Sequence, residues 1–134
     1  MRLYLIYNGV IYSKKNSKKI IRNWRTGKPL ITSNDNAKWM EEDMILQFTL
    51  QSRNYDYKFN QPLGISIRIW EKDKTRRDLD NQATSVLDAL VRAGVIEDDS
   101  VKVVQKLNVE LAGFDKKVPR AEIEIWGLDD EKAL

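Results

Sequence analysis

The chain has 134 residues, of which 42% are hydrophobic and 32% charged, and this length and balance predict one compact domain. Cysteine and histidine are both absent, which excludes disulfides, thiolate or imidazole metal ligands and any Ser-His-Asp triad. An enzyme of this composition has to work with carboxylates, lysines, hydroxyls and a bound metal. No apolar run approaches the ~20 residues that span a bilayer, and the N-terminus lacks the apolar core of a signal peptide. We therefore expect a cytoplasmic protein without a membrane segment.

The charge is divided unevenly along the chain. Residues 1–34 hold eight basic and no acidic side chains, whereas the remaining 100 residues hold 15 basic and 20 acidic ones. This asymmetry predicts a polyanion contact in the first region and an acidic site in the second.

The first third of the chain predicts a strand, an irregular basic segment and a helix. Residues 3–12 are rich in Leu, Ile, Val and Tyr, with a turn or bulge at Gly9. Residues 13–34 are polar and are expected to be irregular. Apolar residues then repeat at helical spacing from Ala37 to Phe48 after a run of N-cap residue types, so a helix is expected over about 35–51.

The remainder predicts a strand, a second helix and two further strands. Residues 63–70 alternate apolar and polar side chains, which is typical of a strand. The second helix begins at Asp78 or Asp80 and ends before Gly94, and its apolar stripe is Ala83, Val86, Leu87, Leu90 and Val91. Residues 101–111 and 120–126 are predicted to form an antiparallel hairpin. The acidic tail over 127–134 is expected to fray.

These elements follow the order β-α-β-α-β-β. The simplest layered solution is a small mixed sheet with the two helices on one face. The sequence thus predicts an α/β protein of the α+β type, with a single domain over residues 1–134. Trp39, Trp70 and Trp126 each lie in a periodic element, and we interpret them as core or subunit-interface residues.

The basic segment over 13–34 has the composition of a DNA-binding surface. Lysine and arginine neutralise phosphates, while Asn and Ser donate hydrogen bonds to phosphate oxygens. Trp24 would stack on an unpaired base or simply pack. A solvated basic loop and a targeting run are the alternatives. The candidate DNA-binding residues in this segment are Lys14, Lys15, Asn16, Lys18, Lys19 and Arg22.

Acidic residues gather at both ends of the second helix. Asp78 and Asp80 open it, and Asp98 and Asp99 follow it. Carboxylates without His or Cys favour hard cations such as Mg²⁺, which activate water for phosphodiester hydrolysis. The alternative is that these acids have only local structural roles: an N-cap, an ion pair between Asp78 and its neighbouring arginines, and a solvated turn.

The length of the second helix separates the two acidic pairs. A helix of 14 residues is about 21 Å long. Asp98 and Asp99 therefore approach Asp78 and Asp80 only if the chain after Gly94 folds back, or if the two pairs come from different subunits. The sequence leaves both arrangements open.

Four short motifs occur together between residues 76 and 99: Arg76-Arg-Asp-Leu-Asp-Asn81, then Leu87-Asp-Ala-Leu90, Gly94 and Asp98-Asp99. In identity and spacing they resemble the RusA family of Holliday-junction resolvases, small endonucleases that are often encoded by phages and prophages. The run Ser13–Lys19 is similar to the N-terminal basic motif of the phage members.

The resemblance implies a homodimer that cleaves four-way or otherwise branched DNA during recombination and repair, with Mg²⁺ or Mn²⁺ as cofactor. It implies that Asp78, Asp80 and Asp99 are catalytic metal ligands and that Asp98 is a neighbouring ligand. Two symmetry-related sites would then nick two opposed strands. Arg76, Arg77 and Asn81 are expected to contact DNA; alternatively the arginines pair with Asp78, and Asn81 orients an aspartate or the turn.

One position departs from the family pattern. Thr84 stands where the family carries a lysine, four residues after the second aspartate of the first motif. A threonine cannot supply a fixed positive charge, so either another base, such as Lys18 or Lys19, takes over, or cleavage is weak or altered in specificity. A branched-DNA-binding protein that lacks cleavage activity is therefore the second hypothesis. A small protein-interaction domain with a basic arm is the third.

Overall fold

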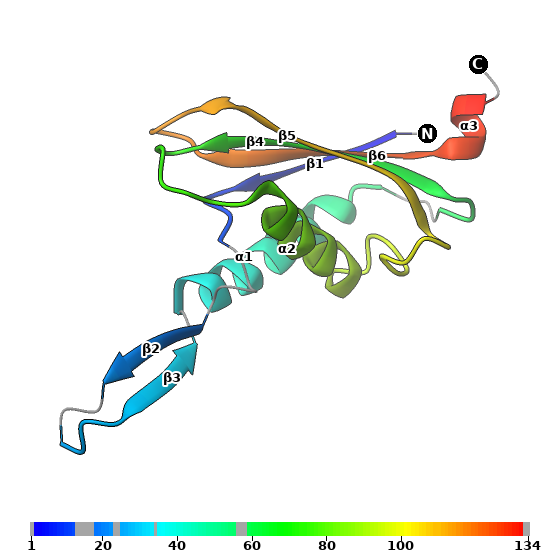
Figure 1. The fold of residues 1–134 in the computed structure, drawn as a ribbon. Helices are drawn as coiled ribbons and strands as arrows, with labels where there is room; N and C mark the ends of the chain where they lie inside the picture. Colours follow the sequence, from blue (N-terminus) through cyan, green and yellow to red (C-terminus); the bar gives the residue numbers. More distant parts are fainter. Residues whose placement is uncertain (1, 13–17, 23–24, 34, 56–58, 133–134) are drawn as a thin grey trace.

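A four-stranded sheet forms the centre of the computed structural model, which describes residues 2–12, 18–22, 25–33, 35–55 and 59–132. The strand order is β1-β6-β4-β5. Helices α1 and α2 cover one face of this sheet (Figure 1). The observed architecture confirms the predicted α+β class with two helices on one side of a mixed sheet. The bounds are Arg2–Asn8 for β1, Asp35–Ser52 for α1, Leu63–Glu71 for β4, Leu79–Arg92 for α2, Val104–Phe114 for β5 and Arg120–Gly127 for β6.

Alternation along the strands builds the core between sheet and helices. Ile65, Ile67 and Ile69 of β4 are all buried on the helix side of the sheet. The residues beside them on β6, Ile123 and Ile125, are buried as well. Each fully buried side chain of this size stabilises the fold by about 1.5–3 kcal/mol. This layer therefore fixes the position of both helices over the sheet.

The β4-α2-β5 unit determines where the predicted acidic site lies. β5 pairs parallel to β4, with α2 as the connection that two parallel strands require, and β6 pairs antiparallel to β4 on its other side. The predicted antiparallel hairpin of the last two strands is therefore wrong. The chain between them crosses the end of β4, where the Asp115 N–H donates to the Glu71 carbonyl oxygen at 2.8 Å. β4 lies between β6 and β5 in the sheet, so the last two strands of the chain each pair with β4 and not with each other.

The basic segment contains a hairpin that the sequence did not predict. Strands β2 (Lys18–Arg22) and β3 (Pro29–Ser33) pair antiparallel, from Lys18 opposite Ser33 to Arg22 opposite Pro29. Gly27 adopts φ +70° in the connecting turn, a conformation that glycine reaches without strain. The hairpin extends away from the sheet and helices as an arm (Figure 1). Its strands are short and lack a clear alternation, so the irregular segment predicted over 13–34 is wrong for these residues.

Smaller differences concern the ends of elements. The first strand stops at Asn8, before Gly9, and the third long strand begins at Val104 rather than at residue 101. The acidic tail is helical over α3 (Leu128–Lys132), where the amides of Asp129 and Asp130 donate to the Gln61 side-chain oxygen. Within the described residues, no helix combines the length and apolar character needed to cross a bilayer.

The three tryptophans of the periodic elements have different environments. Trp126 is buried against Gly64, where a Cβ would lie 2.5 Å from the indole ring. Trp70 is half-buried and lies beneath the guanidinium groups of Arg68 and Arg120. Trp39 is 66% exposed on α1, so it is not a core residue, and its alternative place in a subunit interface stays a prediction.

Candidate active site and nucleic-acid interface

Asp78 and Asp80 lie together at the N-terminal end of α2. Asp78 has an extended backbone (φ −93°, ψ 126°) immediately before the helix, and its carboxylate makes no capping hydrogen bond. It accepts a hydrogen bond from Asn81 Nδ2 at 3.4 Å, and Asp80 is exposed in the first turn. Both carboxylates are open to water at the end of the helix that favours anions. The predicted first half of the acidic site therefore has the exposure that a DNA-cleaving site needs.

The two arginines before Asp78 have opposite environments. Arg76 is 92% exposed, and its Nε lies 3.7 Å from the Asp78 carboxylate. Arg77 is only 11% exposed, and its Nη1 donates to the Glu71 carboxylate at 2.8 Å and to Asp73 at 3.2 Å. Arg76 can reach a phosphate from this position. Arg77 pairs inside the protein, with Glu71 and Asp73 rather than with Asp78, so the structure favours an internal role for it over the predicted DNA contact.

A hydrogen bond from the turn also acts on Asp73. The Thr75 amide donates to its carboxylate at 3.0 Å, and this bond, with that from Arg77, lowers the pKa of Asp73. The carboxylate therefore stays ionised beside Arg77 and fixes the loop that leads to Asp78.

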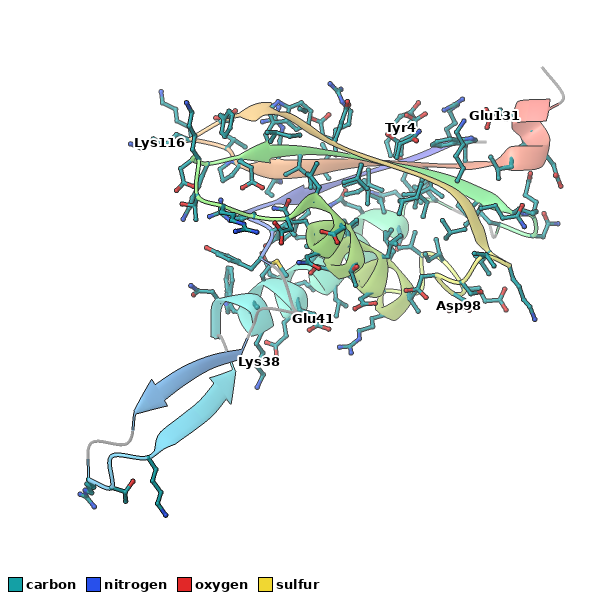
Figure 2. The ribbon with its side chains drawn as sticks, in the orientation of Figure 1. Tyr4, Lys38, Glu41, Asp98, Lys116 and Glu131 are labelled. Carbon is teal, nitrogen blue, oxygen red and sulfur yellow. The ribbon has the colours of Figure 1, made fainter. Side chains whose placement is uncertain are left out.

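Asp98 and Asp99 lie in an exposed loop beyond the other end of α2 (Figure 2). After the helix, the amides of Gly94 and Val95 donate back to the carbonyl oxygens of Val91 and Leu90. The Asp98 carboxylate accepts the Asp99 amide at 2.8 Å. Hydrogen bonds from Ser100 and then from Asp99 lower the pKa of Asp98. Asp98 thus remains a carboxylate, held by its own loop.

The chain does not fold back to join the two acidic pairs. They lie at opposite ends of a helix of 14 residues, about 21 Å apart along its axis. Among the described residues, no group of three or more acidic side chains could hold a metal ion. A magnesium ion bound by all four predicted carboxylates therefore does not fit the described residues of a single chain, and the arrangement in which the chain folds back after Gly94 is wrong.

Thr84 is engaged by its own helix. Its hydroxyl donates to the Asp80 carbonyl oxygen at 3.0 Å, one turn earlier. The hydroxyl therefore has a backbone partner and carries no charge toward the acidic pair. By contrast, the Arg76 guanidinium lies beside the Asp78 carboxylate.

The basic residues predicted to bind DNA lie in or near the hairpin arm. Lys18, Lys19 and Arg22 belong to β2. Arg25 and Lys28 are exposed in the turn, where the Lys28 amide donates to the Thr26 hydroxyl at 3.3 Å. Lys14, Lys15, Asn16 and Trp24 lie outside the described residues.

The uncovered face of the sheet has a different charge pattern from the arm. Arg2 pairs with Glu124, Arg68 with Glu110 and Arg120 with Glu122, across or along the strands. Opposite charges on neighbouring positions of a sheet stabilise it and cancel one another. This face therefore carries paired charges, whereas the excess of basic over acidic residues lies in residues 1–34 of the sequence.

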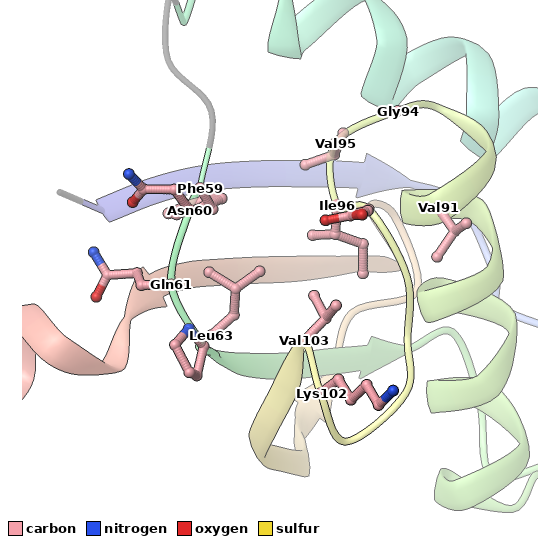
Figure 3. A pocket seen from close by; sticks show the side chains of 12 residues that line it. Phe59, Asn60, Gln61, Leu63, Val91, Gly94, Val95, Ile96, Lys102 and Val103 are labelled. Atoms are coloured by element: carbon pink, nitrogen blue, oxygen red, sulfur yellow. The ribbon is translucent and has the colours of Figure 1, made fainter.

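A pocket of about 660 Å³ lies near the C-terminal end of α2 (Figure 3). Phe59, Val91 and Val95 are among its apolar residues, and Glu97 and Lys102 line it as well. Its lining comes from the segment before β4 and the first residue of that strand, from the last turn of α2 and from the loop between α2 and β5.

Comparison with known proteins gives the class of the chain and then its family. Residues 12–126 match the family model described as Endodeoxyribonuclease RusA, so the class is that of DNA endonucleases. The match spans most of the 134 residues, and the chain belongs to the RusA endodeoxyribonuclease family. The general activity of this family is the endonucleolytic resolution of Holliday junctions. No curated protein matches the chain. The family resemblance of residues 76–99 is thereby confirmed.

Proposed function

We propose that the protein is a metal-dependent, structure-selective endodeoxyribonuclease that resolves Holliday junctions and other branched DNA in the cytoplasm during recombination and repair. The observation that carries this proposal is the open Asp78–Asp80 pair at the start of α2, inside a match to the RusA family. The proposed cofactor is Mg²⁺, with Mn²⁺ as a substitute. When bound, such an ion activates water and stabilises the charge of the phosphodiester under attack.

We further propose that the active unit is a homodimer with two shared sites. Each site would combine Asp78 and Asp80 of one chain with Asp98 and Asp99 of the partner subunit. The separation of the two pairs within one chain supports this arrangement. Leu107 and Leu111 lie on the helix side of β5, beside the core residues of β4, yet they are 41% and 45% exposed. This apolar stripe at the sheet edge is suited to a second copy.

The other side chains would bind and orient the DNA. Arg76 would contact a phosphate beside the acidic pair, because its guanidinium is exposed there. Asn81, which donates to the Asp78 carboxylate, would orient that group. The hairpin arm would follow the DNA backbone with its lysines and arginines.

Cleavage of a synthetic four-way junction tests the proposal. The purified protein should nick the junction at opposed positions with Mg²⁺ or Mn²⁺ and lose this activity in EDTA. A linear duplex of the same sequence is the matched substrate and should remain uncut. Equal cleavage of both substrates, or cleavage that persists in EDTA, contradicts the proposal.

The second candidate function is a branched-DNA-binding protein without cleavage activity. Thr84 favours it, because its hydroxyl is bonded to the helix backbone and supplies no positive charge. The same assay separates the two functions. A binding protein shifts the junction on a gel but gives no nicked product in either metal.

Salt dependence tests the role of the arm. Replacing Lys14, Lys15, Lys18, Lys19 and Arg22 with alanine should flatten the slope of log affinity against log salt by roughly four for a duplex arm. Replacing Lys116 and Lys117, which lie in the loop before β6, with alanine is the control. An unchanged slope in the arm variant means that the arm does not contact the DNA backbone.

A further inference from the structure

Glu71 is a buried carboxylate at the end of β4. Its exposed fraction is 7%, and Gln82 and Ser85 are buried polar residues of α2. A buried charge is costly unless it is paired and hydrogen-bonded. Its Oε1 accepts a hydrogen bond from Gln82 Nε2 at 2.5 Å, and its Oε2 accepts one from Arg77 Nη1 at 2.8 Å. Well-packed apolar residues often give as much stability as a buried ion pair, so stability alone does not account for this arrangement.

The two partners of Glu71 connect it to the acidic end of α2. Arg77 directly precedes Asp78 in the chain, and Gln82 lies one turn after that residue. The backbone between them makes the first helical hydrogen bond, from the Gln82 amide to the Asp78 carbonyl oxygen at 3.0 Å. Holding Arg77 and Gln82 therefore fixes the segment that carries Asp78 and Asp80 from both sides.

The same network reaches the chain that leads to the basic segment. The Gln82 side-chain amide also donates to the Ile11 carbonyl oxygen at 3.1 Å. The Ser85 hydroxyl donates to the Tyr12 carbonyl oxygen at 3.1 Å, and the Arg77 guanidinium lies 5.8 Å from the centre of the Tyr12 ring. Residues 11 and 12 immediately precede residues 13–34, so one buried cluster joins the root of the basic segment to the acidic pair.

We infer that Glu71 is a positioning residue for the cleavage reaction, which holds the Asp78–Asp80 segment and the root of the basic segment in a fixed relation through Gln82 and Arg77. This inference rests on the proposed nuclease function. It assigns Glu71 no contact with DNA or metal, since the carboxylate faces Gln82 and Arg77 inside the protein. Loss of its charge should disturb the geometry of the acids and leave the DNA-binding surface itself intact.

The test compares Glu71→Gln with Glu110→Gln. Both residues are strand glutamates paired with an arginine, but Glu110 pairs with Arg68 on the exposed side of the sheet. Three quantities are measured for each variant: the single-turnover cleavage rate at saturating junction, the junction affinity, and amide hydrogen exchange resolved by segment. A misplaced acidic pair should lower the saturated rate of Glu71→Gln by about tenfold to a hundredfold. Its affinity should stay within about threefold of the wild type, since hairpin and Arg76 are retained.

Hydrogen exchange is the readout that does not need cleavage. In Glu71→Gln, exchange should accelerate in residues 9–12 and 76–82 while the amides of β4 and β6 keep their protection. Faster exchange throughout the protein would indicate a purely structural role and overturn the inference. Glu110→Gln should match the wild type in all three measurements.

A double variant covers the case in which Glu71→Gln does not fold. Replacing Glu71 and Gln82 together, as Glu71→Met with Gln82→Leu, removes the carboxylate and its amide donor, while Arg77 keeps its ion pair with Asp73. The double variant should show the same loss of saturated rate and the same local increase in exchange. If both measurements match the wild type in a folded variant, the inference is wrong. If the wild type itself does not cleave, the proposed function fails, and the exchange pattern still decides the role of Glu71.

Discussion

The two ends of α2 carry the same kind of residue in different surroundings. At the N-terminal end, Asp78 is partly exposed and Asp80 is exposed, but the backbone that carries them is tied to the buried Glu71. At the C-terminal end, Asp98 and Asp99 lie in an exposed loop, and the hydrogen bonds of Asp98 come from its immediate neighbours. The segment of the first pair is thus tied to a buried carboxylate, whereas the hydrogen bonds of Asp98 come from its own loop.

This difference indicates which part of a shared site sets its geometry. Segments with buried contacts open less often than exposed segments held by local hydrogen bonds. The N-terminal end of α2 would therefore act as the rigid half of the site, and the loop after α2 would adjust to it when two chains and DNA meet. Substitutions at the two ends should separate these roles.

The largest effect is expected at the rigid end. Asp80→Asn keeps the size of the side chain but removes a charge that faces water at the start of α2. Junction cleavage should fall by about a hundredfold or more, since an ion-dependent site contributes several kcal/mol to transition-state stabilisation. The measurement is the single-turnover nicking rate in Mg²⁺. Asp129→Asn in α3 is the control and should cleave at the wild-type rate; equal rates for both variants would remove Asp80 from the site.

Mixing two inactive variants tests whether the two ends meet between subunits. Asp80→Asn and Asp99→Asn chains are denatured together and refolded as a mixture. In a shared arrangement, each mixed dimer holds one site with both substitutions and one intact site, so nicking should return to about a quarter of the wild-type level. Sites formed within single chains would leave every site of the mixture damaged, and no activity would return. The unmixed variants, refolded in parallel, set the background.

A smaller effect concerns stability at the rigid end. Arg77→Met leaves Glu71 buried without its cation, so the free energy of unfolding should fall by about 3 kcal/mol. Urea unfolding followed by tryptophan fluorescence measures the change. Arg76→Met is the matched control, because the neighbouring arginine is exposed and its ion pair is long. Similar losses of unfolding free energy in both variants would mean that the buried pair of Arg77 with Glu71 stabilises the protein no more than the exposed pair of Arg76 with Asp78.

Much of the fold could be predicted because its periodic segments are long. The strand over 63–70, the helix over about 35–51 and the helix from Asp78 or Asp80 to before Gly94 followed from repeated apolar spacing, and the structure places them within one or two residues. Strand order could not be predicted in the same way. β5 and β6 are adjacent in sequence, and only the packing of β4 between them shows that they do not pair. The hairpin arm makes backbone pairs over two five-residue strands, too short for a periodic signal.

The candidate site was predictable in its residues but not in its arrangement. The motif and its charge pointed to Asp78, Asp80, Asp98 and Asp99, and helix geometry showed that one helix separates them. The buried role of Arg77 and its partner Glu71 was not predictable, because nothing in the sequence distinguishes this arginine from Arg76. A polar Gln82 beside the apolar stripe of α2 was the available signal. It depends on contacts to residues 11 and 71, both of which lie outside α2.

The smallest effect is expected in the exposed loop. Hydrogen bonds from Ser100 are the largest cause of the lowered pKa of Asp98, so Ser100→Ala should raise this pKa toward the ordinary value of 3.8. Asp98 favours the folded state above the pH at which an unfolded aspartate ionises, and this contribution is lost as the pH falls through the lowered pKa. In Ser100→Ala this contribution should therefore be smaller, and its loss should be complete at a higher pH. An NMR titration of the side-chain carboxyl carbons measures the shift, with Asp73 as the internal control because Thr75 and Arg77 hold its pKa down independently. An unchanged pKa of Asp98 in Ser100→Ala would mean that Ser100 does not hold the loop. The proposed difference between the two ends of α2 would then be wrong for the C-terminal end.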